Sequence, residues 1–363
     1  MTIADVASHA QVSTTAVSKV LRDAYGVSAA MRAKVQAAID ELGYRPQAAA
    51  RAMRGRTFTI GVLFAHMRNP FFPDIVDGLS EQVGEAGYQV IMVQSGALPA
   101  LPPAAAEIAE RRAIHALVDR QVDGMLMIAP ISSRSRLEEF AESTPTVVLG
   151  RHDRSAIYDA VLDDDEAGAE LVVEHLVALG HRRIAHIGQK DQTRAKPGEL
   201  LHTIRLETYK RVMREHGLGD EIDVAITAYT EEGGYAGMLE LLAREPRPTA
   251  VFAGADLAAL GALAAIQESG LAVPGDVSVA GYDNTRLAAL ANLSLTSVDQ
   301  GGALMGQTAG RLLLERIGGR TASVRFTVTP TLVPRRSTAP LTPAPVPRPS
   351  AGPLTPPGGT GGP

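Results

Sequence analysis

The sequence TIADVASHAQVSTTAVSKVL, residues 2–21, decides the fold at the N-terminal end of this chain. Apolar residues recur at helical spacing in two short runs, from Ile3 to Ala10 and from Val17 to Leu21. Between the runs lies Gln11-Val12-Ser13, and the Ser13 hydroxyl is suited to cap the second helix. Two short helices joined by a tight turn are typical of a helix-turn-helix.

A third helix is expected from Ser28 onward. Val35, Ala38 and Ile39 fall on one face of it, and Gly43 suits the left-handed residue that ends a helix. We therefore predict an all-α, three-helix head over residues 1–45. In a helix-turn-helix the second helix enters the major groove of DNA, and its first residues meet the base edges.

The predicted second helix carries side chains that suit DNA recognition. Thr14 and Thr15 can hydrogen-bond several bases or touch a thymine methyl, and Lys19 prefers the O6/N7 edge of guanine. Ser13 and Ser18, together with the helix N-terminus, are predicted to hold phosphates. An ordinary solvated surface of a small helical bundle is the alternative interpretation of the same residues.

The charges are distributed unevenly along the chain. Residues 1–56 carry eight Lys/Arg and four Asp/Glu, a net charge of +4, whereas the whole chain has −5. A basic head on an acidic body favours contact between the head and a polyanion. A solvated charged face would give the same numbers, so the charge alone leaves both interpretations open.

Residues 46–57 are predicted to form a hinge helix or linker. Ala48–Met53 is a strong helix former, but a helix this short is unstable unless something supports it. Arg51 adds positive charge, and Met53 is an apolar side chain suited to wedge between base steps in a minor groove. A flexible linker with chance arginines is the alternative.

Residues 58–337 alternate apolar strand-like runs with helical patterns, which predicts βαβ units and parallel sheets covered by helices on both faces. The strand candidates are residues 59–64, 89–93, 124–128, 146–149, 160–162, 183–187, 224–227, 250–253 and 277–280. This number exceeds one ordinary open sheet, so we predict an α/β sensor of two lobes that meet near residues 150–162. Ligands of such folds bind beyond the carboxyl ends of the strands, here in the cleft between the lobes.

Composition argues against several other classes of protein. The chain of 363 residues has no cysteine, no apolar run long enough to cross a bilayer and no recognisable signal peptide, so we expect a cytoplasmic, nucleoid-associated protein without membrane contact. Phosphate-binding loop, nucleophile-elbow and zinc-protease motifs are absent from the sequence, so we expect neither an enzyme nor a cofactor or metal. Residues 338–363 hold nine Pro and five Gly and are predicted to be disordered.

The head and hinge together resemble the signature of the lactose-repressor (LacI/GalR) family. The resemblance is carried by residues 2–21, by Gly43-Tyr-Arg-Pro46 and by Ala50-Arg51-Ala-Met53 at the hinge. Sensor motifs follow in the same order: Asn69-Pro-Phe-Phe72, Val122-Asp-Gly-Met125, Gly180-His-Arg-Arg-Ile184, Pro248-Thr-Ala-Val-Phe252, Pro274-Gly-Asp-Val-Ser278, Gly281-Tyr-Asp-Asn284 and Leu295-Thr-Ser-Val298.

Four features depart from the pattern of the family. Gln11 stands where glycine is usual, so a non-glycine residue is expected to hold a strained conformation there. Met53 replaces the usual leucine wedge, and Ala255 replaces a common asparagine. The segment 189–203 is longer than usual, which leaves the identity of the effector open.

The resemblance implies a repressor that binds a pseudo-palindromic operator in double-stranded DNA as a homodimer, with tetramers in some members. It implies a periplasmic-binding-protein fold, with lobe 1 at about 58–160 and 290–320 and lobe 2 at about 161–289 and 321–337. The effector, expected to be a sugar or related polyol, would act as inducer or corepressor. A solute-binding protein of a transport system is the alternative. The effector contacts implied by analogy are Phe71, Phe72, Arg151, Asp164, Arg205, Tyr229 and Asp283.

Overall fold

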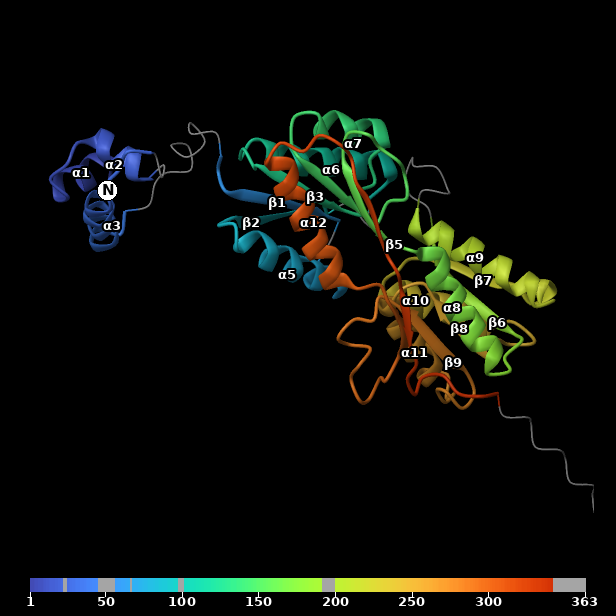
Figure 1. Cartoon of the computed structure of the whole chain (residues 1–363). Coiled ribbons are helices and arrows are strands. Elements are labelled where there is room, and N and C mark those ends of the chain that lie inside the picture. The colour runs from blue at the N-terminus through green and yellow to red at the C-terminus, as the bar shows by residue number, and fades with distance from the viewer. Residues whose placement is uncertain (22–24, 45–55, 66, 97–100, 191–199, 342–363) are drawn as a thin grey trace, which may run out of the picture. The chain divides into compact units, whose positions relative to one another are not determined.

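A computed structural model describes residues 1–21, 25–44, 56–65, 67–96, 101–190 and 200–341 (Figure 1). The head consists of α1 (Ile3–His9), α2 (Thr14–Leu21) and α3 (Ala29–Leu42), which confirms the predicted helix-turn-helix. Gln11 has a φ of 49°, so this non-glycine residue does hold the strained left-handed conformation expected of the turn. Gly43 ends α3 with a φ of 57°, as predicted.

The first sheet unit is a six-stranded sheet in the order β11-β5-β4-β3-β1-β2, and all of its pairs are parallel. Its helices cover both faces, with α5 and α12 on one and α6 and α7 on the other, as the two core clusters show. The strands are β1 (Thr59–Phe64), β2 (Gln89–Gln94), β3 (Gly124–Ile128), β4 (Thr146–Leu149), β5 (Asp159–Asp163) and β11 (Arg325–Val328). The helices are α5 (Phe71–Gly84), α6 (Pro103–Val118), α7 (Arg134–Ala141) and α12 (Gly302–Ile317).

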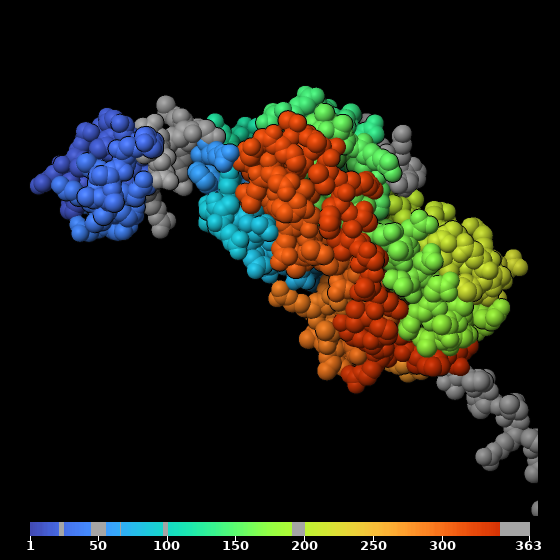
Figure 2. All heavy atoms as spheres, viewed as in Figure 1, coloured from blue at the N-terminus to red at the C-terminus, as the bar shows by residue number. Residues whose placement is uncertain are grey.

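Helices α5 and α12 pack closely because glycines lie at their crossing. A Cβ on Gly306 would lie 1.9 Å from the Ile75 carbonyl oxygen, and one on Gly78 would lie 2.2 Å from that of Ala303. The space-filling view shows the orange-red α12 on the face of the unit where the blue α5 also lies (Figure 2). These backbones therefore approach to a distance that leaves no room for a side chain at either glycine.

The second sheet unit repeats this architecture in the order β12-β10-β9-β8-β6-β7, and the pairs from β10 to β7 are parallel. Helices α10 and α11 cover one face, and α8 and α9 cover the other. Its strands are β6 (Ile184–Gln189), β7 (Asp223–Thr227), β8 (Ala250–Ala253), β9 (Ser278–Tyr282), β10 (Thr296–Asp299) and β12 (Thr331–Val333). Its helices are α8 (Asp165–Ala178), α9 (Leu201–Glu215), the short 3₁₀ turn η2 (Gly219–Glu221), α10 (Glu231–Leu242) and α11 (Asp256–Glu268).

The two compact units have segment boundaries that differ from those predicted for the two lobes. Residues 1–168, 190–205 and 299–331 form the first unit, and the remaining segments form the second. Strand β11 pairs with β5 in the first sheet, whereas residues 321–337 had all been assigned to the second lobe. Strand β5 itself belongs to the first sheet, so the boundary expected at residue 161 is wrong.

The segment that ends the described chain is also ordered further than predicted. Residues 338–341 were expected to be disordered, but Ala339 donates its N–H to Ser278 Oγ at 3.1 Å, and Leu341 donates to the Leu179 carbonyl at 2.9 Å. His175 Nε2 lies 3.0 Å from Thr338 Oγ1. These bonds hold the segment on the second unit. The rest of the predicted tail, 342–363, lies outside the described residues, and among those that are described no helix has the length and apolar character to cross a bilayer.

Candidate functional site

The head presents a polar face on α2, the second helix of the helix-turn-helix. Thr14, Thr15 and Lys19 are exposed, whereas Val17 and Val20 on the opposite side are buried in the core of the head. The predicted base-reading residues therefore share an accessible surface. Any contact they make with DNA remains a proposal.

The start of α2 is capped as the sequence predicted, because Ser13 Oγ accepts the Ala16 N–H at 3.1 Å. Ser13 is exposed and Ser18 is half-buried. The free N–H groups of a helix start favour an anion, so the position of Ser13 suits a phosphate. The predicted hinge residues Ala50, Arg51 and Met53 lie outside the described residues.

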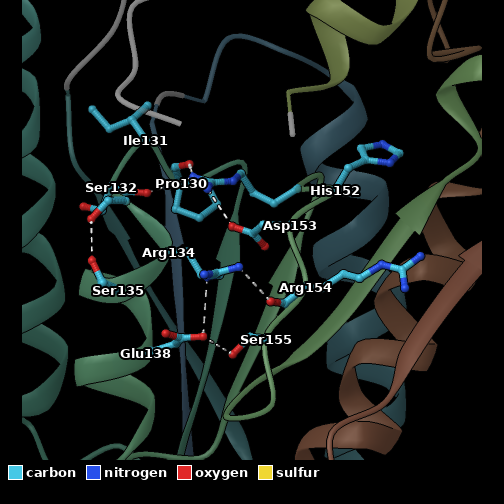
Figure 3. A network of polar contacts seen from close by, with 12 residues as sticks. Pro130, Ile131, Ser132, Arg134, Ser135, Glu138, His152, Asp153, Arg154 and Ser155 are labelled. Carbon is cyan, nitrogen blue, oxygen red and sulfur yellow. Dashed lines mark hydrogen bonds and ion pairs between the residues drawn. The ribbon is translucent and has the colours of Figure 1, made fainter. Parts of the chain in front are cut away.

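In the first sheet unit, the loop after β3 is held from two sides. The buried Glu110 carboxylate of α6 accepts the N–H groups of Ile131 at 2.8 Å and Ser132 at 2.9 Å. The Arg151 guanidinium donates through Nη1 to the carbonyls of Pro130 at 3.0 Å and Ser132 at 2.8 Å. Pro130 and Ser132 are labelled in Figure 3. A carboxylate and a cation thus fix this loop at the carboxyl end of the sheet.

Arg151 has a structural role that the sequence did not reveal. Its Nη2 donates to Asp153 Oδ2 at 2.6 Å, and Tyr158 donates its hydroxyl to Asp153 Oδ1 at 2.8 Å. Burial and the neighbouring Asp153 charge raise the pKa of Tyr158, which keeps this hydroxyl a donor. Both terminal nitrogens of Arg151 therefore serve the fold, and a direct effector contact of Arg151 stays a prediction.

A second buried cluster joins the starts of α8 and α9 to the loop after β4. Arg205 Nε donates to Asp165 Oδ1 at 2.6 Å, and His152 Nε2 lies 2.6 Å from Asp165 Oδ2. Arg205 Nη2 lies 4.0 Å from Asp163 Oδ2. Burial alone would raise the pKa of Asp165, but the Arg205 charge and the His152 hydrogen bond outweigh it, so this pKa is lowered and the carboxylate stays ionised.

Asp164, which the resemblance implied as an effector contact, is not one of the carboxylates that face Arg205. Asp164 is exposed, and its Oδ1 accepts the Ala167 N–H at 3.0 Å as an N-terminal cap of α8. Asp165 and Asp163, one residue to either side, are buried and face Arg205. An effector contact of Asp164 stays a prediction.

The two predicted aromatic residues at the start of α5 both pack against the core of the first unit but differ in burial. Phe71 is buried in the core of the first unit, and a Cβ on Gly302 would lie 2.8 Å from its ring. Phe72 is only partly buried. Of the pair, Phe72 therefore remains the better candidate to face a ligand, and Phe71 serves packing.

In the second unit, the predicted effector residues Asp283 and Tyr229 both contact the backbone of nearby segments. Asp283 is buried and has a φ of 110°, a conformation that a non-glycine residue keeps only where the structure imposes it. Its N–H donates to the Val298 carbonyl at 3.0 Å. The Tyr229 ring lies against Gly254, where a Cβ would come within 2.1 Å of the hydroxyl.

Between these two residues in the sequence lies a buried carboxylate that the sequence analysis missed. Asp256 begins α11, and its Oδ2 accepts the Thr285 N–H at 2.7 Å and the Thr285 hydroxyl at 2.9 Å. Its Oδ1 accepts the Ser297 hydroxyl at 2.6 Å. Burial outweighs these hydrogen bonds and the more weakly acting Arg335 charge, and raises the pKa of Asp256 to about 6. Its position three residues after the end of a buried strand, β8, was the available signal.

The described parts of the chain contain no group of three His, Asp or Glu side chains that could hold a metal ion. The pattern of buried charges instead suits the recognition of an organic ligand by hydrogen bonds. A helix-turn-helix head followed by two parallel α/β units defines a class of DNA-binding regulators with a sensor domain.

Comparison with known proteins identifies the family. Residues 2–47 match the family described as bacterial regulatory proteins, lacI family, and residues 173–338 match a periplasmic binding protein-like domain. The ribose operon repressor of Escherichia coli K12 is 34% identical over 343 residues, which cover 93% of this chain and 99% of that protein. This chain therefore belongs to the lacI family of transcriptional regulators.

Other relatives agree in length and fold. The transcriptional repressor PurR of Erwinia tasmaniensis is 36% identical over 347 residues, which cover 93% of this chain and 97% of PurR. The crystal structure of the lac repressor dimer bound to operator and the anti-inducer ONPF has a TM-score of 0.78 at 29% identity, covering 93% of this chain and 99% of that one. These relatives are repressors, and the match extends over nearly their whole length, so the comparisons give no support to a solute-binding protein of a transport system.

Proposed function

We propose that this chain is a repressor whose homodimer binds a pseudo-palindromic operator and whose DNA affinity is controlled by a small polyhydroxylated molecule. The observation that carries the DNA-binding part is the exposed set Thr14, Thr15 and Lys19 on a helix whose start is capped by Ser13. The solved relative that is bound to operator as a dimer supports the same geometry. The protein would act in the cytoplasm, at the nucleoid, as a binding protein and not as an enzyme.

The effector would bind at the carboxyl ends of the strands. The proposed contacts are Phe72 and Arg205, which lies in the segment 190–205 of the first unit, and Tyr229 and Asp283 of the second unit. An aromatic face and charged hydrogen-bonding groups suit a sugar, and the ribose operon repressor is among the relatives. Effector binding would favour one of two sensor states and thereby change the grip of the heads on two half-sites.

The Lys19→Ala variant tests the DNA-binding part. We expect a loss of roughly 10- to 100-fold in affinity for the operator and relaxed preference at one base position, because a good side-chain contact to a base discriminates by about 1–3 kcal/mol. Binding to selected operator variants in gel-shift titrations measures both effects.

Lys34→Ala is the matched control for this test. It removes the same charge from an exposed position on α3 of the same head. It should lower affinity by less and leave base preference unchanged. If both variants weakened all operator variants equally, Lys19 would act only through its charge.

A thermal-shift screen of pentoses, hexoses and nucleobases against the full-length protein tests the effector part. Compounds that raise the melting temperature should also change operator binding in a gel shift, since a ligand that stabilises one sensor state shifts the equilibrium between the two. A protein that no sugar stabilises and whose DNA binding no sugar alters would contradict the proposed effector class.

A further inference from the structure

The cluster around Arg205 is unusual because the cation is already balanced by protein carboxylates. Asp165 bonds Arg205 Nε through one oxygen and His152 through the other, each at 2.6 Å. Asp163 brings a second carboxylate to 4.0 Å from Arg205 Nη2. The Arg205, Asp163 and Asp165 side chains are at most 3% exposed, so water screens these charges weakly.

The position of the cluster suggests contact with a ligand. Asp163 is the last residue of β5, and His152 lies in the loop that follows β4. Both are therefore at the carboxyl end of the first sheet, where parallel α/β sheets bind their ligands. A buried group of interacting titratable side chains at such an edge is a candidate for function.

An arginine whose charge is not balanced by the protein binds carboxylate or phosphate strongly, because its guanidinium can donate two parallel hydrogen bonds to two oxygens of the anion. Arg205 cannot act in this way while Asp165 is ionised. An anion brought to Arg205 would also lie close to two carboxylates, and the repulsion in this buried setting would offset the attraction.

We propose that Asp165, held in place by His152, is a specificity-determining residue that makes Arg205 a donor to neutral ligands and excludes phosphorylated or carboxylated ones. This inference rests on the proposed function in so far as Arg205 faces the effector. His152 acts through Asp165 and is a positioning residue. His152 contacts Asp165 Oδ2 and thereby fixes the orientation in which Asp165 Oδ1 accepts the hydrogen bond from Arg205. In Figure 3 its ring points away from the side chain of Asp153.

Asp165→Asn in the full-length protein tests the proposal, with inorganic phosphate and D-ribose 5-phosphate as probes at constant ionic strength. We expect the wild type to bind neither probe measurably. The variant keeps the shape of Asp165 but removes its charge, so its affinity for both should rise roughly tenfold or more once the like charge is gone. Isothermal titration calorimetry measures the gain. A loss of stability alone would not create a new binding activity.

Glu170→Gln is the matched control, because Glu170 and Arg211 form an ion pair between the same two helices at 2.6 Å, on their exposed side. It should gain no phosphate binding. The double variant Asp165→Asn/Arg205→Gln should lose the gain of the single variant, since the cation that receives the phosphate is gone. If Asp165→Asn bound phosphate no better than Glu170→Gln, Asp165 would be purely structural and the proposal would be wrong.

A second variant covers the case in which Asp165→Asn does not fold. Asp163→Asn leaves the bonds of Asp165 in place and removes the other carboxylate, and it should raise phosphate affinity by a smaller factor, roughly threefold, because this charge lies farther from Arg205. An unchanged affinity would contradict the proposal. A protein that responded to no sugar would contradict the proposed function but would leave this comparison intact.

Discussion

The two sheet units share an architecture but bury carboxylates in opposite electrostatic settings. In the first unit, Asp159 accepts hydrogen bonds from Arg316 at 2.9 Å and Arg320 at 2.5 Å. In the second unit, Asp256 accepts hydrogen bonds from the Thr285 N–H and hydroxyl and from the Ser297 hydroxyl. Burial alone would raise the pKa of both carboxylates, and the arginine partners of Asp159 reverse the direction for that residue.

This difference predicts opposite responses to pH. Burial would raise the pKa of Asp159, but the Arg320 and Arg316 hydrogen bonds outweigh it and lower this pKa. The stability that Asp159 contributes is therefore present above its unfolded pKa and lost as the pH falls. Burial raises the pKa of Asp256 to about 6, so its contribution is full below the unfolded pKa of 3.8 and is lost as the pH rises toward and through 6.

The largest effect is expected from Asp159→Ala. It leaves Arg316, whose side chain is 8% exposed, and Arg320 without their buried carboxylate, and should lower the free energy of unfolding by about 3–5 kcal/mol. Urea unfolding measures the loss, and hydrogen exchange should locate it in the first sheet. Glu139→Ala breaks the exposed pair with Arg136 and should cost no more than about 0.5 kcal/mol. Equal losses in the two variants would show that the buried pair adds no stability.

Asp256→Asn should abolish the opposite response in the second unit. Titration of Asp256 should cost the wild type about 2 kcal/mol of stability between pH 4 and pH 6, because each pKa unit corresponds to about 1.4 kcal/mol and the shift is complete only above pH 6. Asparagine can accept the Thr285 N–H and donate to Ser297 Oγ, so the variant should fold and be insensitive to pH in this window. Hydrogen exchange of the β8 and β9 amides at both pH values measures the effect. Asp276→Asn, at an exposed carboxylate, should keep the wild-type profile.

The sequence revealed the two units, but it placed the chain crossings between them several residues too early. All nine strand candidates are present, since long apolar runs mark strands that are buried on both faces. Strands β10, β11 and β12 were missed: β11 and β12 are short and partly exposed, whereas β10 is buried but only four residues long. The assignment of residues 321–337 to one lobe failed for this reason.

The candidate site was predictable by residue type and less so by position. The run Asp163-Asp164-Asp165 spans the end of β5 and the start of α8, where side-chain periodicity changes from two to 3.6 residues. Sequence alone could not show that the first and third carboxylates face inward. The partners of Arg151 are carbonyls 19 and 21 residues away, which only the fold brings together.

A third test concerns the feature in which the two units are alike. Gly306 in the first unit and Gly261 in the second both lie at helix crossings, where a Cβ would come within 1.9 Å of a carbonyl oxygen. Alanine at either position should force the helices apart at a cost of about 1–3 kcal/mol, independent of pH. Gly84→Ala, in α5 where an added Cβ would have no neighbour within 4 Å, should be neutral or stabilising. If the stability lost on substituting Gly306 or Gly261 changed with pH, the crossing would not be maintained by packing alone, and the prediction would be wrong.

The smallest effect is expected from deleting the C-terminal segment, which contacts the second unit. Removing residues 338–363 deletes the bonds of Thr338, Ala339 and Leu341 to the second unit and should lower its stability by about 1–2 kcal/mol, because each net hydrogen bond contributes about 1 kcal/mol at most in partly exposed positions. Hydrogen exchange should show faster opening around β9 and the end of α8, with the first sheet unchanged. Removing only residues 342–363 is the control and should leave both units as they are. If the shorter deletion had the same effect as the longer one, the stabilising contacts would lie beyond Leu341; if the longer deletion loosened the first sheet equally, the two units would unfold as one.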